Sequence, residues 1–202
     1  MGLKHQNRVL VNIRGCNGAG KSTIPMSMMD DPDMFVEELR YSDGKKVASF
    51  TVFPTYGWIA LGTYFNKTGG LDTIKGNERI KTVLYAAIGM YPEYDIIMEG
   101  IICSTVFSSN SELFHEIEEK TELQVIILTL VPPLEECLKR VQLRNGGKPI
   151  KELLVKNKYG SVVRSHEKFK SEGFTCVKVN TSKVTKRAML GSFLKTVEKH
   201  RR

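Results

Sequence analysis

Cysteine is scarce in this sequence, and its spacing excludes the common metal-binding patterns. The four cysteines are Cys16, Cys103, Cys137 and Cys176. None of them forms a CxxC pair, and no histidine lies at zinc-finger spacing. We therefore expect no zinc site, and we expect reduced thiols, as in a cytoplasm.

Long hydrophobic runs and targeting signals are also missing. No apolar run reaches the roughly 18–20 residues that span a bilayer. The first residues hold no apolar segment followed by the small residues of a cleavage site. Gln6 stands where a myristoylation signal at Gly2 would need serine or threonine. These absences predict a protein with no membrane partner.

The composition that remains is typical of a globular chain. The 202 residues are 41% hydrophobic and 26% charged, which excludes a wholly disordered protein, a collagen and a coiled coil. The length suits one α/β domain or at most two very small ones. We expect a single domain over residues 1–202.

Positive charge is concentrated in the C-terminal part. The formal net charge is +8, but residues 1–120 hold 12 Lys and Arg against 15 Asp and Glu, a net of −3. Residues 121–202 hold 18 against 7, a net of +11. This excess indicates either a solubilising surface or a surface that faces nucleic acid.

Apolar runs alternate with helical patterns along the chain. Strands are predicted at residues 8–13, 94–98, 124–131 and 174–179, and a hairpin at 35–41 and 46–53. Helices are predicted at residues 21–29, 73–90, 111–120 with Asn110 as N-cap, 133–144, 150–170 with Gly160 as a point where it can break, and 185–199. Residues 54–72 are expected to be rich in loops. The alternation favours an α/β fold with a mostly parallel sheet and helices on both faces, which binds ligands at the carboxyl ends of its strands.

One motif in this pattern is highly specific. Residues 15–22 match GxxxxGK[ST] in full, between a predicted strand and a predicted helix. The motif predicts a P-loop fold that binds ATP and Mg²⁺. Glycines let backbone N–H groups surround phosphates, Lys21 bridges the β- and γ-phosphates, and Ser22 offers a hydroxyl to the metal. The expected nucleotide-binding residues are Gly15, Cys16, Asn17, Gly18, Ala19, Gly20, Lys21, Ser22 and Thr23.

Two carboxylates are candidates for the chemistry. Glu99 ends a buried strand and is followed by Gly100, so it can hold a magnesium-bound water or orient the nucleophile; alternatively it caps another element. Asp72 follows a double glycine. It is either the N-cap of the next helix or a base that accepts a proton from the acceptor hydroxyl.

A basic segment resembles the lid of a kinase. Arg140 and Arg144 are four residues apart and share a helix face, and Lys148 follows a mobile Asn-Gly-Gly turn. Cations that close over the γ-phosphate would stabilise its charge and exclude water, and Arg164 could complete the clamp. Alternatively, these residues form an exposed basic helix. We expect the lid at about residues 138–170 and an acceptor-side insertion at about 35–72.

Aromatic residues crowd that insertion. They either pack in the core or form a slot on which a nucleobase stacks, as enzymes do with bases turned out of DNA. The residues are Phe53, Tyr56, Trp58, Tyr64 and Phe65.

The sequence resembles the phage-encoded P-loop kinases that act on 5-hydroxymethyluracil in DNA, a branch similar to thymidylate kinases. The resemblance is carried by VNIRGCNGAGKST, GGLDTIK, IIMEG and the segment RVQLRNGGK…RSHEKFKSEG. It implies transfer of the ATP γ-phosphate to the 5-hydroxymethyl group, a step in thymine hypermodification, in the cytoplasm of an infected bacterial host. It also implies that residues 15–22 bind ATP and that Arg140 and Arg144 form the lid.

Three functions remain open on the sequence alone. The first is the DNA base kinase, and the second is a kinase of free nucleotides, nucleosides or small metabolites. The third is an NTP-binding protein without turnover. The basic C-terminal part favours the first, since a free nucleotide needs no extended cationic surface. The candidate DNA-facing residues beyond the lid are Lys183, Lys186, Arg187, His200, Arg201 and Arg202.

Overall fold

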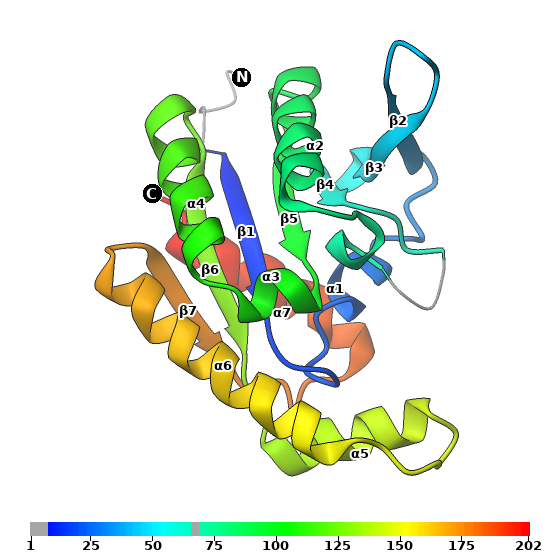
Figure 1. Cartoon of the computed structure of the whole chain (residues 1–202), viewed down its shortest axis with the longest axis vertical. Helices are drawn as coiled ribbons and strands as arrows, with labels where there is room; N and C mark the ends of the chain where they lie inside the picture. Colours follow the sequence, from blue (N-terminus) through cyan, green and yellow to red (C-terminus); the bar gives the residue numbers. More distant parts are fainter. Residues whose placement is uncertain (1–7, 66–68) are drawn as a thin grey trace.

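The computed structural model describes residues 8–65 and 69–202, which form a seven-stranded sheet flanked by helices (Figure 1). The strands are β1 (Val9–Arg14), β2 (Phe35–Arg40), β3 (Lys46–Phe53), β4 (Trp58–Leu61), β5 (Asp95–Glu99), β6 (Gln124–Leu130) and β7 (Thr175–Val179). Their order across the sheet is β2-β3-β4-β5-β1-β6-β7. Strands β4, β5, β1, β6 and β7 run parallel to one another, whereas β3 pairs antiparallel with both β4 and β2 at one edge of the sheet. The predicted mostly parallel sheet is confirmed.

Helices cover both faces of this sheet, as the alternation predicts. They are α1 (Thr23–Met26), α2 (Asn77–Met90), α3 (Ile101–Thr105), α4 (Ser108–Lys120), α5 (Leu134–Arg144), α6 (Glu152–Ser171) and α7 (Lys186–His200), with 3-10 turns η1 (Pro54–Tyr56) and η2 (Leu71–Thr73). Helices α2, α3, α4 and α6 pack on one face, and α1 and α7 pack on the other. None of the helices in the described ranges is long and apolar enough to cross a bilayer.

The central strand β1 shows why the sheet is buried on both sides. Its side chains alternate between the two cores: Leu10 joins the cluster under α2 and α4, whereas Val11 and Ile13 join the cluster under α1 and α7. All six residues of β1 are buried. A strand that is buried on both faces is encoded by a nearly continuous run of apolar residues, which is why the sequence predicts it.

The expectation of loops at residues 54–72 is wrong for residues 58–61. Trp58–Leu61 form β4, which pairs in parallel with β5 and antiparallel with β3. Four residues give too short a run for the alternation to stand out, and Gly57 and Gly62 on either side suggest loops. Strand β4 therefore brings the end of the insertion next to β5.

Several helix boundaries also differ from the prediction. Helix α1 has only four residues, and the helix expected from residue 73 begins at Asn77 because residues 71–73 form η2 instead. Asn110 is not an N-cap, because α4 begins at Ser108 and the buried Asn110 amide donates to the carbonyl of Cys103 at 2.8 Å. Gly160 does not break α6. Helix α3 was not predicted at all.

Candidate active site

The loop that follows β1 has the geometry of a phosphate-binding loop. Gly18 has φ +82° and Gly20 has φ +100°, in the region that glycine favours. A Cβ at Gly18 would lie 2.4 Å from the carbonyl oxygen of Cys137 in α5. The loop is therefore packed directly against the first turn of α5, just before the predicted lid, and no larger residue fits at this position.

The side chain of Lys21 is bound by backbone carbonyl groups inside this loop. Its Nζ donates to the carbonyl oxygens of Gly15 at 2.9 Å and Cys16 at 3.2 Å. The side chain is buried, and burial lowers the pKa of Lys21, while the nearby Glu99 opposes that shift. The ammonium group is therefore held within the P-loop by backbone carbonyl groups.

Glu99 stands at the carboxyl end of β5, beside the P-loop. The Ser22 hydroxyl lies 3.1 Å from Oε1 and 3.3 Å from Oε2 of Glu99. Glu99 is buried, and this burial raises its pKa to about 7, against the opposing pull of Lys21 and the Ser22 hydroxyl. The structure therefore brings together the two residues predicted to hold Mg²⁺, and both offer the oxygen atoms that this ion prefers.

The double glycine before Asp72 allows the chain to approach Glu99. Gly70 has φ +63°, and a Cβ there would lie 2.4 Å from Oε1 of Glu99. The backbone N–H of Gly70 donates to the carbonyl of Thr63 at 3.2 Å, which closes the loop that leaves β4. Glycine at this position is a steric requirement of the site.

Asp72 caps a helix, but not the helix predicted. Its Oδ1 and Oδ2 accept from the backbone N–H of Ile101 at 3.0 and 3.1 Å, at the start of α3. A Cβ at Gly100 would lie 3.1 Å from Oδ1 of Asp72. Asp72 is exposed and Glu99 is buried, so the two carboxylates lie on either side of Gly100 in different surroundings. Such a difference suits two different roles.

Most of the aromatic residues of the insertion pack in the core. Phe53, Trp58 and Tyr64 are buried, and the Trp58 ring lies 5.1 Å from that of Phe193. These three cannot form an open stacking slot, whereas Phe65 is 63% exposed. Burial and the nearby Glu99 raise the pKa of Tyr64 well above its usual value.

The two lid arginines have different surroundings. Arg140 is held by Glu136 at 2.7 Å and by the carbonyl oxygen of Thr181 at 3.0 Å, and it also reaches the carbonyl oxygen of Gly18 at 3.4 Å. The Thr181 hydroxyl donates in turn to the carbonyl of Ala19 at 2.9 Å. Arg140 therefore stabilises the P-loop, both directly at Gly18 and through Thr181.

Arg144 is exposed instead, and it lines a hollow of about 330 Å³ together with Asn17 of the P-loop. Of the two lid arginines, only Arg144 is exposed. Lys148 is also exposed. Arg164 is exposed and bonds Ser161 of its own helix at 3.3 Å, so the structure does not bring it to the P-loop.

A buried arginine next to the P-loop was missed by sequence reasoning. Arg14 ends β1 and is fully buried; it donates to the carbonyls of Ser104 at 2.8 Å and Val106 at 2.9 Å, and to the Ser165 hydroxyl at 3.1 Å. Burial lowers its pKa to about 10. Arg14 thus ties β1 to the residues that follow Glu99 and to α6. A charged residue that closes an apolar run directly before the motif is the signal that could have revealed it.

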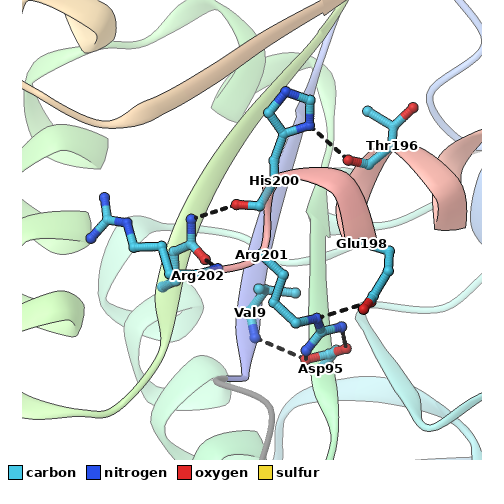
Figure 2. Close-up of polar contacts among 8 residues, drawn as sticks. Val9, Asp95, Thr196, Glu198, His200, Arg201 and Arg202 are labelled. Carbon is cyan, nitrogen blue, oxygen red and sulfur yellow. Dashed lines mark hydrogen bonds and ion pairs between the residues drawn. The ribbon is translucent and has the colours of Figure 1, made fainter.

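Part of the basic C-terminus is structural and lies far from the P-loop. Arg201 forms an ion pair with Asp95, at 2.5 Å, and Asp95 also accepts from the backbone N–H of Val9 (Figure 2). Val9 and Asp95 begin β1 and β5, so this cluster lies at the amino ends of the strands. The expectation that Arg201 faces DNA is therefore wrong, because its charge is used within the fold. Lys183, Lys186 and Arg187 are exposed near the start of α7.

Residues 4–190 match the family model described as "5-hmdU DNA kinase". The chain belongs to the 5-hmdU DNA kinase family. A protein of that name from Pseudomonas phage M6 is 34% identical over 171 residues, which cover 82% of this chain and 87% of the relative. The 5-hmdU DNA kinase of Bacillus phage SP10 is 47% identical over 175 residues, or 84% of this chain, but the match spans only 26% of that longer protein.

The fold of this 5-hmdU DNA kinase family member resembles that of a solved kinase structure. A gluconokinase structure from Sinorhizobium meliloti 1021 aligns with 96% of this chain and 94% of its own, with a TM-score of 0.53 and 11% identity. At that identity the likeness shows the fold alone. It agrees with the P-loop kinase fold predicted from the sequence.

Proposed function

We propose that the protein transfers the γ-phosphoryl group of ATP to the 5-hydroxymethyl group of 5-hydroxymethyluracil bases in DNA. The observation that carries this proposal is the meeting of Lys21, Ser22 and Glu99 at the P-loop, with Asp72 held across Gly100 from Glu99. The family supplies the acceptor: its named members are 5-hmdU DNA kinases. The expected partners are ATP and DNA that contains 5-hydroxymethyluracil, in the cytoplasm of the infected host.

ATP would be held by residues 15–23, with Lys21 leaving its carbonyl partners to contact the β- and γ-phosphates. Ser22 and Glu99 would hold Mg²⁺, which otherwise takes waters and phosphate oxygens as ligands. The metal would offset the charge of the phosphates. Glu99 has a raised pKa and lies next to the Ser22 hydroxyl. A bound cation would lower that pKa and favour the ionised carboxylate.

Asp72 is our candidate for the base. Its two oxygens share one N–H donor, that of Ile101, and the side chain is exposed, so lone pairs remain for an acceptor hydroxyl. The hydroxymethyl oxygen would form a bond to the γ-phosphorus, and the bond from that phosphorus to the bridging oxygen would break, so that ADP leaves. The hydroxyl proton would pass to Asp72. Arg144 would approach the phosphates from the lid, and the acceptor base would enter from the side of residues 35–72.

The decisive test supplies γ-labelled ATP and Mg²⁺ with three acceptors in parallel. These are hydroxymethyluracil DNA, the same DNA with thymine, and free hydroxymethyldeoxyuridine nucleotides. We expect label only on hydroxymethyluracil DNA, and none with Lys21→Ala. Label that appears only on the free nucleotides would mean a nucleotide kinase instead, and no transfer with tight ATP binding would mean an NTP-binding protein without turnover.

A further inference from the structure

The end of the lid carries an unusual combination of exposed side chains. Where α5 turns into α6, three leucines lie on the surface, with exposed fractions of 68% for Leu143, 68% for Leu153 and 53% for Leu154. Arg144, Lys148 and Lys151 are exposed in the same stretch of the chain, and Arg144, Lys151 and Leu154 line one hollow. We call these six residues the lid-turn surface. Apolar side chains of this size are rarely left in water together without a partner.

The lid-turn surface is also strongly positive. Residues 139–158 contain seven lysines and arginines and a single acidic residue, Glu152. Glu152 forms an ion pair with Lys156, and Arg140 forms one with Glu136. Within residues 139–158, all of which the structure describes, Arg144, Lys148 and Lys151 make no ion pair. Their charge is therefore available to an anionic partner.

The position of this surface fits a partner that also reaches the active site. The α5–α6 turn projects at the same end of the molecule as the loop between β1 and α1, at the carboxyl ends of the strands (Figure 1). The hollow that contains Arg144, Lys151 and Leu154 reaches Asn17 of the P-loop. A long anionic molecule bound at the P-loop side could thus extend over the lid turn.

A second basic segment has the same charge but not the same character. Residues 183–202 also hold seven lysines and arginines against one acid, Glu198. None of the large exposed hydrophobic residues of the described chain lies there, and its end is fastened at the amino ends of the strands. Charge alone would not distinguish the two segments, but the leucines and the position do.

We propose that the lid-turn surface is a docking surface for the substrate DNA. Lys148 and Lys151 contact backbone phosphates beside the target nucleotide. Leu143, Leu153 and Leu154 pack against sugars and base faces that become exposed when the target base leaves its stack, as apolar side chains do in proteins that part base steps. The inference rests on the proposed function, because it assumes a DNA substrate.

The test compares two charge-matched double variants of the full chain. Lys148→Ala with Lys151→Ala alters the lid turn, and Lys195→Ala with Lys199→Ala alters exposed lysines of α7. Binding to a fluorescent hydroxymethyluracil duplex is measured by anisotropy over a range of salt concentrations, and ATP binding is measured separately. We expect the lid pair to weaken DNA binding about tenfold and to reduce the slope of log K against log salt by about 2, roughly 1 per phosphate contact. ATP affinity should fall much less than DNA affinity, and the α7 pair should bind DNA like the wild type.

The leucines are tested by Leu153→Ala with Leu154→Ala, against Met90→Ala, an exposed residue at the far end of α2. A fluorescent base analogue next to the target reports unstacking. We expect the leucine pair to reduce that signal, with an unchanged salt slope, and Met90→Ala to have no effect. Equal loss of DNA binding in the lid and α7 pairs, a loss of ATP binding alone, or an unchanged signal in the leucine pair would overturn the proposal. Because these readouts need no turnover, a wild type that binds DNA through the lid but transfers no label would refute the proposed function and not the docking surface.

Discussion

At the scale of single residues, the proposed chemistry depends on two carboxylates, one buried and one exposed. The motif and the strand pattern are sufficient to predict Lys21, Ser22 and Glu99 at one place, because each follows directly from local sequence. The contact of Asp72 with the N–H of Ile101 could not be predicted, since it joins residues 29 positions apart through a short helix that no periodicity reveals. The sequence left Asp72 as either a cap or a base, and its placement allows both roles.

Asp72→Asn separates these roles. The amide keeps an oxygen that can accept from Ile101 but cannot act as a base, so we expect kcat to fall by a factor of about 100 or more. The free energy of unfolding should change by less than about 1 kcal/mol, the usual value of a helix cap. Steady-state kinetics and thermal melts check this. A normal kcat in Asp72→Asn would show that another group accepts the proton.

His166 should make the fold sensitive to mild acid. It is buried in α6, its Nδ1 lies 2.7 Å from the Thr129 hydroxyl, and burial lowers its pKa, followed by the repulsion of Lys178. The unfolded chain binds a proton near the ordinary pKa of 6.5, which the folded chain resists. The contribution of His166 to the free energy of unfolding should therefore decrease as the pH falls below about 6.5, while protonation of the buried Glu99, whose pKa is raised to about 7, acts in the opposite direction. Urea titrations of the wild type and His166→Asn between pH 7.5 and pH 5.5 isolate this contribution: the wild type should lose stability relative to the variant as the pH falls, and identical slopes would contradict this account.

At the scale of elements, the structure corrects the sequence where tertiary pairing decides. The long apolar runs at β1, β5 and β6 and the hairpin turn are strong local signals, and these elements lie within a residue or two of their predictions. Strand β4 and helix α3 are four and five residues long, and both owe their form to the strands and glycines beside them. The lid helices were found, but which face of α5 meets the P-loop was not visible in the spacing of Arg140 and Arg144.

The two lid arginines should behave differently when replaced. Arg140→Ala removes the contacts to Gly18 and Thr181, so we expect weaker ATP binding and a loss of about 1–3 kcal/mol of stability. Arg144→Ala should lower kcat more than ATP affinity and leave the melting temperature unchanged, because Arg144 is exposed. Isothermal titration with ATP, kinetics and melts on both variants check this. The reverse pattern would mean that Arg140 is the phosphate contact.

At the scale of the whole molecule, positively charged residues lie at both ends of the sheet, but they have different roles at the two ends. At the carboxyl ends, we propose that cations of the lid and P-loop bind anionic ligands. At the amino ends, the C-terminal residues fasten α7 to the first residues of the central strands (Figure 2). The net charge of +8 therefore includes charge that stabilises the fold and charge that we propose binds anions, and composition alone could not separate them.

Arg201→Ala measures the stabilising part. It leaves the buried Asp95 carboxylate without its ion pair, and we expect a loss of about 3 kcal/mol of stability. Arg202→Ala is the matched control, because its side chain is exposed and its backbone N–H still donates to Gln124. Chemical denaturation of both variants provides the values. Similar, small losses in the two would show that the tail does not hold the sheet.

The central claim concerns where the phosphoryl group is placed on the DNA, and one measurement tests it most directly. Hydroxymethyluracil DNA with blocked 5′ ends is treated with the protein and γ-labelled ATP, digested to nucleotides without phosphatase, and separated by mass and chromatography. The account predicts that the label is found on a nucleotide that carries an additional phosphate on the 5-hydroxymethyl group of its base. Label that requires a free 5′ end, or that is found on the sugar, would contradict it.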